Sequence, residues 1–397
     1  MKLAFDERVT GEPGFHALVV GVSHYPHMPK QYGMRQLTAP AMTAYRIYKW
    51  LLDRRANLRV PLASVRLLLS PSPDEAEVIA GDAELGGRWG EASTDEFVSA
   101  AEAWRDDAAR DARGMTLFYF AGHGIQLSKN DQFLLMKDFG RFKNEYAGSV
   151  SAVNIYDGMS NGPNEQLADT QFYFFDACRN LPRQRATQPS QGWSPQLVEY
   201  DDLDARKVFK PSWSVADRRK APAFYAAVPG TAAYAEVGGL TLFGKALLDS
   251  LDCSSERWER VNGKRRWQVT ARTLSDTVSA YFKEVAKEVD VEQQFTEHRV
   301  SKDAILHYLD ERPWVEVAFE LEPAAAQRIA RVVVQDYNDV THLSLPVPVE
   351  PHPFTDKLPW GDYNVTASFQ PPAPPLKDCE RRLDARLPRQ TVKLECQ

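Results

Sequence analysis

The chain has 397 residues, of which 43% are hydrophobic and 26% charged, and its formal net charge is -6. This is the composition of a globular protein long enough for two domains, and its acidic balance argues against a general nucleic-acid binder. The amino terminus lacks the apolar core of a signal peptide, and no apolar run reaches the roughly 18 residues of a membrane span. Four cysteines are too few for a disulfide scaffold, so we expect a cytoplasmic protein with free thiols; a bond between Cys379 and Cys396 is the alternative.

Apolar runs alternate with helical periodicity along most of the chain. Short apolar runs predict strands at 15–22, 65–69, 116–121, 133–136, 171–176 and 223–227. Apolar residues at helical spacing predict helices at 36–52, 93–110, 241–250 and 273–287, of which the second opens with an S-x-x-E capping box from Ser93 to Glu96. Strands that alternate with helices and are apolar on both faces predict an α/β fold with a mostly parallel sheet between helices.

This pattern breaks in two places. The segment from 181 to about 220 is rich in proline, glutamine, arginine and lysine and has no periodicity, and so long a connection inside a compact domain is typically functional or flexible. After Trp314, alternation with period two at 315–321 and strand-like runs at 331–335 and 363–369 predict a small β-sandwich. We therefore expect one domain over 1–312 and an accessory domain over 313–397.

Two strand ends carry the residues of chemical interest. His123 and Cys178 each come shortly after an apolar strand. The carboxyl ends of parallel strands share one edge of a sheet, so a base and a thiol are expected side by side there. An inert buried thiol is the alternative interpretation of Cys178, but the neighbouring Asp176 and Arg179 predict that this strand end is polar and exposed.

Glycines flank the histidine on both sides. Gly122 and Gly124 allow unusual backbone angles and the close approach of a ligand. A core histidine is the alternative interpretation of His123, but its placement relative to Cys178 favours a general base. We also expect the N–H of Gly124 to point at an oxyanion that develops during reaction.

Several stretches resemble motifs of the caspase, metacaspase and orthocaspase group of cysteine peptidases, in the order of that family. They are Val19–Tyr25, Tyr119–Gln126, Asp131–Asp138, Phe175–Asn180, Phe224–Gly230 and Phe243–Leu248. The spacing between His123 and Cys178 is also close to the roughly 50 residues of the caspase arrangement. The resemblance implies a bacterial caspase-like peptidase domain over 1–312, whereas the accessory domain lies outside it.

The resemblance also implies an activity, that of a cysteine endopeptidase acting on protein or peptide substrates through a His–Cys dyad. Cys178 would attack the scissile carbonyl, and His123 would assist thiolate formation and protonate the leaving amine. The N–H groups of Gly124 and Cys178 would stabilise the oxyanion, a contribution of about 2.7–4 kcal/mol per donor. The family pattern requires no third catalytic residue. In the family, the segment at 181–220 is an activation or intersubunit linker; its many basic residues suit self-cleavage, and a solvated loop is the alternative.

Specificity depends on acidic residues near the cysteine. In metacaspase-like proteins, the Asp two residues before the cysteine lines the S1 pocket and favours Arg or Lys at P1, and Asp176 matches it; a carboxylate that caps backbone N–H groups is the alternative. A second family acid follows the first strand, but Thr43 stands at its position. Glu236 either adds charge near the cleft or is a solvated loop acid. Arg35 alone would make a poor pocket for an acidic side chain, so basic P1 specificity is predicted.

No cofactor or metal is expected. The chain lacks a Gly-rich phosphate loop, an H-E-x-x-H motif and paired C-x-x-C motifs. Some relatives need calcium, but the acidic run at 201–204 is better interpreted as solvated charges than as a calcium loop.

The resemblance implies a biological role as well. Bacterial relatives act as effectors in stress or antiphage responses and stay inactive until a signal arrives, either a nucleotide-derived messenger or another protein. Aromatic residues of the accessory domain would stack a nucleotide base or form its core: Trp314, Tyr337, Phe354, Trp360, Tyr363 and Phe369. The alternative function is a non-catalytic sensor or adaptor that binds a ligand or partner, and a hydrolase of non-peptide amides is the third. No nucleic-acid or membrane partner is expected.

Overall fold

The structure is a computed structural model that describes residues 3–30, 33–126, 132–141, 147–162, 165–178, 208–209, 217–227, 239–288, 295–301 and 303–397. Most of the predicted linker, Arg179, Glu236 and the acidic run at 201–204 lie outside the described residues. Contacts divide the chain into two compact units, Met1–Leu248 with Val285–Leu306 and Asp249–Glu284 with His307–Gln397. The domain boundary between 312 and 313 stays a prediction.

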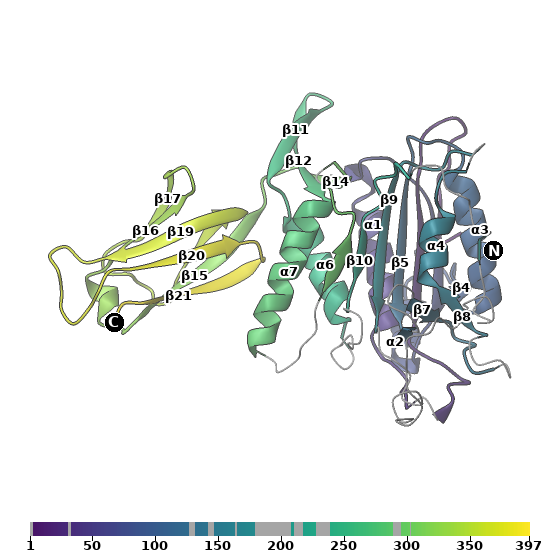
Figure 1. Ribbon diagram of the computed structural model, residues 1–397, viewed down its shortest axis with the longest axis horizontal. Helices are drawn as coiled ribbons and strands as arrows, with labels where there is room; N and C mark the ends of the chain where they lie inside the picture. Colours follow the sequence, from purple (N-terminus) through teal and green to yellow (C-terminus); the bar gives the residue numbers. More distant parts are fainter. Residues whose placement is uncertain are drawn as a thin grey trace, which may run out of the picture. The chain divides into compact units, whose positions relative to one another are not determined.

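One large sheet lies at the centre of the first unit (Figure 1). Its strands are, in spatial order, β1 (Phe5–Asp6), β3 (Leu62–Ser70), β2 (Phe15–Val22), β5 (Met115–Gly122), β9 (Thr170–Ala177), β10 (Ala223–Tyr225) and β13 (Thr296–His298), with β4 (Gly90–Glu91) beside β3. The central strands run parallel, and only β1 and β13 at the edges are antiparallel. Every residue of β2, β3, β5 and β9 is buried, which confirms the predicted mostly parallel sheet.

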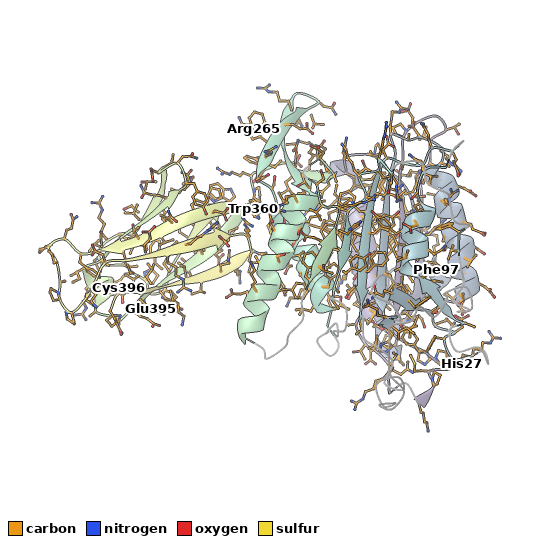
Figure 2. The ribbon with its side chains drawn as sticks, in the orientation of Figure 1. His27, Phe97, Arg265, Trp360, Glu395 and Cys396 are labelled. Carbon is orange, nitrogen blue, oxygen red and sulfur yellow. The ribbon has the colours of Figure 1, made fainter. Side chains whose placement is uncertain are left out.

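Helices cover both faces of this sheet, because successive side chains of a strand point to opposite faces. On β5, Phe118 packs against Trp104 and Phe97 of α3 (Thr94–Ala108), with ring centroids 6.0 and 6.2 Å apart (Figure 2 labels Phe97). The next residue, Tyr119, places its hydroxyl beside Gly244 of α6 (Leu242–Cys253) on the other face. The other α-helices that the structure describes are α1 (Pro40–Asp53), α2 (Pro73–Ala80), α4 (Ala152–Gly158) and α7 (Ala271–Glu288), and most of α7 belongs to the second unit.

The capping box predicted at Ser93 and Glu96 is only half formed. Ser93 caps α3 by accepting the N–H of Glu96 at 3.5 Å, but the Glu96 carboxylate accepts the N–H of Glu91 instead. A complete capping box lies at Ser72 and Glu75 and opens α2, a helix that the sequence did not predict. The motif therefore identified one helix start and was overlooked at another.

A small antiparallel sheet follows β5. It consists of β6 (Gly124–Gln126), β7 (Gln132–Leu135) and β8 (Ser149–Ser151), and all of its residues are buried. Ile125, Leu134 and Val150 from its three strands join the hydrophobic cluster on the α3 side of the large sheet. Because β6 begins one residue after His123, this sheet fixes the chain on the carboxyl side of that histidine.

Two further sheets form the sandwich expected in the second unit. One orders β18 (Phe354–Pro359), β15 (Trp314–Glu322) and β21 (Arg389–Glu395), and the other β17 (Thr341–Ser344), β16 (Arg331–Asp336), β19 (Gly361–Ser368) and β20 (Cys379–Ala385). Apolar side chains from both sheets share one core, which includes Trp360, Tyr363 and Phe369, whereas Trp314 and Tyr337 are exposed. Elsewhere in the chain, β11 (Arg257–Val261), β12 (Lys264–Thr270) and β14 (Ile305–Leu309) form a third sheet.

None of the four cysteines forms a disulfide. The Sγ atoms of Cys379 and Cys396 lie 3.3 Å apart in the sandwich, in contact but not bonded to each other (Figure 2 labels Cys396). Among the helices of the described residues, none is long and apolar enough to cross a membrane.

A buried ion cluster ties together the amino-terminal ends of the central strands. Asp107 of α3 is 2% exposed and lies within 3.2 Å of three guanidinium groups, those of Arg66, Arg110 and Arg8. Burial opposes ionisation of this carboxyl group, but the charges around it outweigh burial, Arg66 most strongly, so the pKa of Asp107 is lowered. The cluster joins α3 to β3 and to the segment that follows β1.

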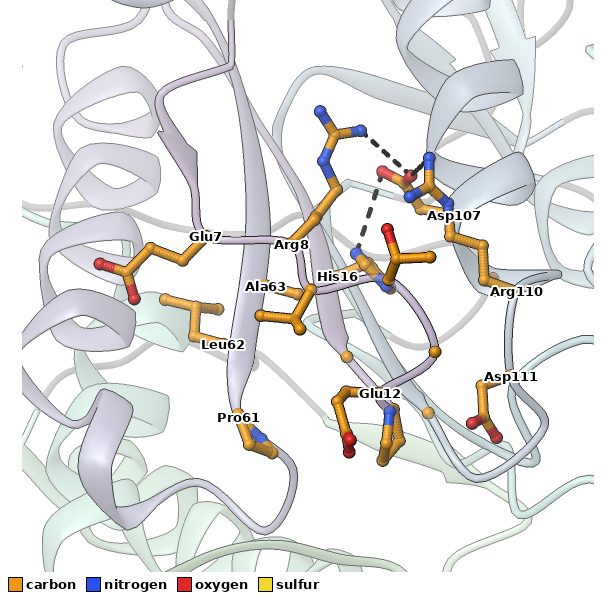
Figure 3. Close-up of a pocket in the computed structure, with 17 residues that line it drawn as sticks. Glu7, Arg8, Glu12, His16, Pro61, Leu62, Ala63, Asp107, Arg110 and Asp111 are labelled. Atoms are coloured by element: carbon orange, nitrogen blue, oxygen red, sulfur yellow. Dashed lines mark hydrogen bonds and ion pairs between the residues drawn. The ribbon is translucent and has the colours of Figure 1, made fainter.

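His16 and Ser64 extend this cluster into the sheet. His16 Nδ1 lies 2.8 Å from Ser64 Oγ, which donates to Asp107 at 3.3 Å. Burial lowers the pKa of His16 to about 4, so the imidazole is neutral at pH 7. Figure 3 shows His16 and Asp107, with Arg8 and Arg110, at a pocket of about 540 Å³ beside the starts of β2, β3 and β5.

We expect Asp107→Ala to lower the free energy of unfolding by about 3–5 kcal/mol, because it leaves Arg66 buried without a counter-charge. Urea denaturation of the full chain at pH 7 measures this change. Asp111→Asn is the control: its partner Arg113 is largely exposed, so this substitution should change stability little. Equal effects of the two substitutions would contradict a stabilising role for the buried cluster.

Candidate active site

The parallel register of β5 and β9 brings the two predicted catalytic positions together. The last paired residues of these strands are Gly122 and Ala177, and His123 and Cys178 come directly after them. Neighbouring strands lie about 4.8 Å apart, so the two residues leave the sheet side by side. Figure 1 shows β5 and β9 as adjacent strands of the large sheet.

Gly124 makes this approach close. A Cβ atom at position 124 would lie 2.5 Å from the carbonyl oxygen of Cys178 and 3.0 Å from both Ala177 Cβ and Gln132 Nε2. Real Cβ atoms do not approach backbone oxygen so closely, so a side chain here would push the Cys178 segment away. The position therefore requires glycine for reasons of space.

The N–H of Gly124 is not used by the β6–β7 ladder. Gly124 is opposite Leu134, and the N–H of Leu135 donates to the carbonyl of His123 at 3.0 Å. In an antiparallel pair, this pattern makes Gly124 and Leu134 a non-hydrogen-bonded pair, so the Gly124 N–H points away from β7. This orientation suits a donor to a ligand, and its role at an oxyanion stays a prediction.

A backbone carbonyl sets the tautomer of His123. Its Nε2 lies 2.7 Å from the carbonyl oxygen of Arg35, which can only accept, so Nε2 carries the proton. Burial lowers the pKa of His123, and the bond to Arg35 opposes this shift without cancelling it. The imidazole is therefore neutral near pH 7, with the lone pair of Nδ1 available as a base.

Tyr25, which follows β2, supports the histidine from the other side. Its hydroxyl accepts the N–H of His123 at 2.7 Å and donates to the carbonyl of Leu135 at 3.4 Å, and its ring centroid lies 5.0 Å from that of His123. The side-chain amide of Gln36 pairs with the backbone of Tyr25, through distances of 2.6 and 2.9 Å. This pairing ties the segment that carries Arg35 to the segment that carries Tyr25.

These supporting groups were missed at the sequence level. Arg35 was considered only for its side chain, whereas the group that contacts His123 is its carbonyl, which no residue type specifies. Tyr25 lies inside a stretch that resembles the family, yet nothing in the sequence assigned it a contact. Gln36 was expected inside a helix, but α1 begins at Pro40 and leaves Gln36 free to bind Tyr25.

The expectation that Asp176 is exposed was wrong. β9 continues to Ala177, so Asp176 lies within the sheet and is 2% exposed. It accepts hydrogen bonds from the hydroxyl groups of Tyr119, at 2.8 Å, and Thr241. Burial raises the pKa of Asp176 to about 6, although these bonds and one from the backbone of Gly244 act in the opposite direction.

Thr43 contacts Thr241, one of the hydrogen-bond partners of Asp176. Its Oγ1 accepts the N–H of Thr241 at 3.0 Å and donates to the carbonyl of Ala39 at 2.8 Å. Thr241 in turn donates to Asp176. Thr43, at the position of the second family acid, is therefore connected to Asp176 through Thr241. A neutral hydroxyl occupies that position in this chain, and Asp176 is left with hydroxyl partners there.

The pocket of Figure 3 lies away from the candidate site. Gly14, Leu62 and Gly114 line it, and they come at or just before the starts of β2, β3 and β5. His123 and Cys178 follow the opposite ends of their strands. In the part of the chain that the structure describes, no three His, Cys, Asp or Glu side chains gather as metal ligands would; the absence of a metal or cofactor stays a prediction.

We expect Gly124→Ala to lower the free energy of unfolding by about 1–3 kcal/mol and to slow alkylation of Cys178, since the new methyl group displaces the Cys178 carbonyl. Gly81→Ala is the matched control. Gly81 has a φ of -70° and no neighbour closer than 3.4 Å to an added Cβ, so alanine fits there. Iodoacetamide kinetics and urea denaturation give both readouts, and identical behaviour of the two variants would contradict the close contact.

Comparisons with known proteins identify the family of this chain. The uncharacterized protein y4kE of Sinorhizobium fredii is 24% identical over 288 residues, which are 71% of this chain and 76% of that protein. Among solved structures, a protein from Geobacter sulfurreducens is similar with a TM-score of 0.43 and 13% identity, covering 74% of this chain and 97% of that one. Caspase-1 from Spodoptera frugiperda is similar with a TM-score of 0.37 and 11% identity, covering 73% and 88%. The model of the caspase domain family matches residues 15–317, and the chain therefore belongs to the caspase-domain peptidase family.

Proposed function

We propose that the chain is a cysteine endopeptidase in which Cys178 is the nucleophile and His123 the general base. The observation that carries this proposal is the placement of the two residues directly after the paired ends of β5 and β9. The bond from His123 Nε2 to the Arg35 carbonyl supports it, because it leaves Nδ1 as the basic nitrogen.

The proposed reaction has two halves. Nδ1 of His123 takes the thiol proton, and Sγ of Cys178 attacks the scissile carbonyl carbon. The N–H groups of Gly124 and Cys178 donate to the resulting oxyanion. Collapse breaks the C–N bond, and the amine leaves with the proton from His123. Water, deprotonated by the same Nδ1, then hydrolyses the thioester and releases the carboxylic acid and the thiol.

We propose that the peptidase prefers Arg or Lys at P1 through Asp176. The support is a buried carboxyl group two residues before the nucleophile, with a pKa of about 6 that leaves it mostly ionised at pH 7. A carboxylate in a region of low polarity attracts a cationic side chain strongly. With Thr43 beside it instead of a second acid, the S1 charge rests on one carboxylate.

We further propose a role as a signal-activated effector in a bacterial stress or antiphage response in the cytoplasm. Four cysteines without a disulfide are consistent with a reducing compartment. Trp314 and Tyr337 are the exposed aromatic residues of the sandwich among the six named above as stacking candidates, so a nucleotide-derived activator would stack there. Phage challenge of bacteria that express the wild type or Cys178→Ala tests the role, and equal survival would contradict it.

We expect Cys178→Ala to lower peptide cleavage by at least about a thousandfold, because the substitution removes the nucleophile. A peptide library incubated with purified protein, with and without extract of stressed cells, measures cleavage. Cys253→Ala is the control, since its buried thiol has a pKa raised to about 12 and should play no part in cleavage. The Cys178→Ala chain should also keep its 181–220 segment intact. A folded wild type that cleaves nothing would favour the sensor or adaptor function.

We expect the preference for Arg over the uncharged analogue citrulline at P1 to weaken as the pH falls from about 7 to about 5, because Asp176 takes up a proton near its pKa of about 6. The ratio of kcat/KM for the two substrates measures this preference, and any titration of His123 cancels from it. In Asp176→Asn, the ratio should be near one and independent of pH. A constant wild-type ratio, or a preference for Asp at P1, would contradict the assignment.

A further inference from the structure

We infer that Gln132 is a positioning residue that fixes the backbone on both sides of Cys178, a role that deepens the proposed peptidase function and rests on it. Gln132 is the first residue of β7 and is 1% exposed. Its side-chain amide reaches from the small sheet across Gly124 to the end of β9. It contacts main-chain atoms of the Cys178 segment.

The contacts are two hydrogen bonds from a single nitrogen. Nε2 of Gln132 donates to the carbonyl of Ala177 at 3.2 Å and to the carbonyl of Cys178 at 2.9 Å. The first carbonyl belongs to the peptide group that precedes Cys178, and the second to the peptide group that follows it. One side chain therefore holds both peptide planes that meet at the nucleophile.

Holding both planes determines the direction of the reactive groups. A trans peptide is planar, so the N–H of Cys178 points away from the carbonyl of Ala177 and hence away from the Gln132 amide. With both planes fixed, the φ and ψ angles of Cys178 are fixed too, and so is its Cα–Cβ bond. Gln132 thus sets the direction of the predicted oxyanion donor and the origin of the Cys178 side chain.

Within the described part of the chain, the other half of the amide has no partner that would account for its burial. Oε1 of Gln132 is buried and has no hydrogen-bond partner among the described residues. Rotating the amide by half a turn would place Oε1 against two carbonyl oxygens, which cannot donate, so the orientation is unambiguous. A buried acceptor without a partner is unfavourable, so its presence here calls for an explanation, and the two hydrogen bonds donated by Nε2 provide one.

The chain supplies a matched control at the other end of β9, the strand that Cys178 follows. Gln171 is also fully buried, and its Nε2 also donates to two carbonyls, those of Met159 at 3.0 Å and Ala168 at 2.8 Å. It lies at the amino end of β9, away from Cys178. Substitution of Gln171 should therefore affect folding without touching the nucleophile.

The experiment compares Gln132→Met, Gln132→Glu and Gln171→Met with the wild type, using a peptide that the wild type cleaves. We expect Gln132→Met to lower kcat about a hundredfold with KM nearly unchanged, a loss similar to that of one oxyanion donor. Gln132→Glu should be as impaired at about pH 8, and its kcat relative to wild type should rise toward about pH 5, where the protonated carboxyl group can donate again. Gln171→Met should lower the melting temperature but keep kcat within about threefold of wild type, as expected for a site away from the chemistry.

The alkylation rate of Cys178 with iodoacetamide separates this inference from the proposed function. If iodoacetamide alkylates Cys178 of the wild type but the protein cleaves no peptide, the peptidase proposal fails. The alkylation rates of the same four proteins then test the positioning role alone. Alkylation should be slower in Gln132→Met, and in Gln132→Glu its rate relative to wild type should rise at acidic pH. If the wild type cleaves peptides, a kcat of Gln132→Met within threefold of wild type would overturn the inference. So would a loss in Gln132→Glu that does not vary with pH, because a purely structural defect has no reason to titrate there.

Discussion

The parallel register of β5 and β9 is the constraint on which the candidate site depends. Because Gly122 pairs with Ala177, the two strands end level with each other, and the next residue on each is the predicted base or nucleophile. Gly124 has no side chain, so the carbonyl of Cys178 can approach its backbone closely. A shift of one residue in this register would exchange the faces of every side chain on β9 and separate the pair.

Around this pair, the protein uses side chains to hold main-chain atoms. The phenol of Tyr25 accepts the N–H of His123, and the amide of Gln36 hydrogen-bonds the backbone of Tyr25. The amide of Gln132 donates to the carbonyls of Ala177 and Cys178. Each contact holds backbone that lies at or just beyond the end of a strand. Such support from rigid neighbours keeps reactive groups in position without adding charged side chains next to them.

The sequence predicted the parts of the fold whose pattern is local. Uniform apolar runs identified β2, β5 and β9, because strands buried on both faces admit few polar residues. It failed where partners come from elsewhere. Asp176 is charged and was expected to be exposed, but Tyr119 and Thr241, distant in sequence, provide hydrogen bonds that allow its burial. In the sandwich, β20 was missed because most of its side chains are exposed and charged, so its pattern lacks an apolar signal.

The partner of His123 has a genetic consequence. A histidine oriented by a carboxylate can lose that carboxylate through one codon change, and activity falls with it. Here the accepting atom is the carbonyl of residue 35, which every amino acid carries. No missense change at that codon can remove this carbonyl. Substitutions that break the hydrogen bond should therefore lie at positions that hold the segment in place, such as Gln36 and Tyr25, and not at residue 35 itself.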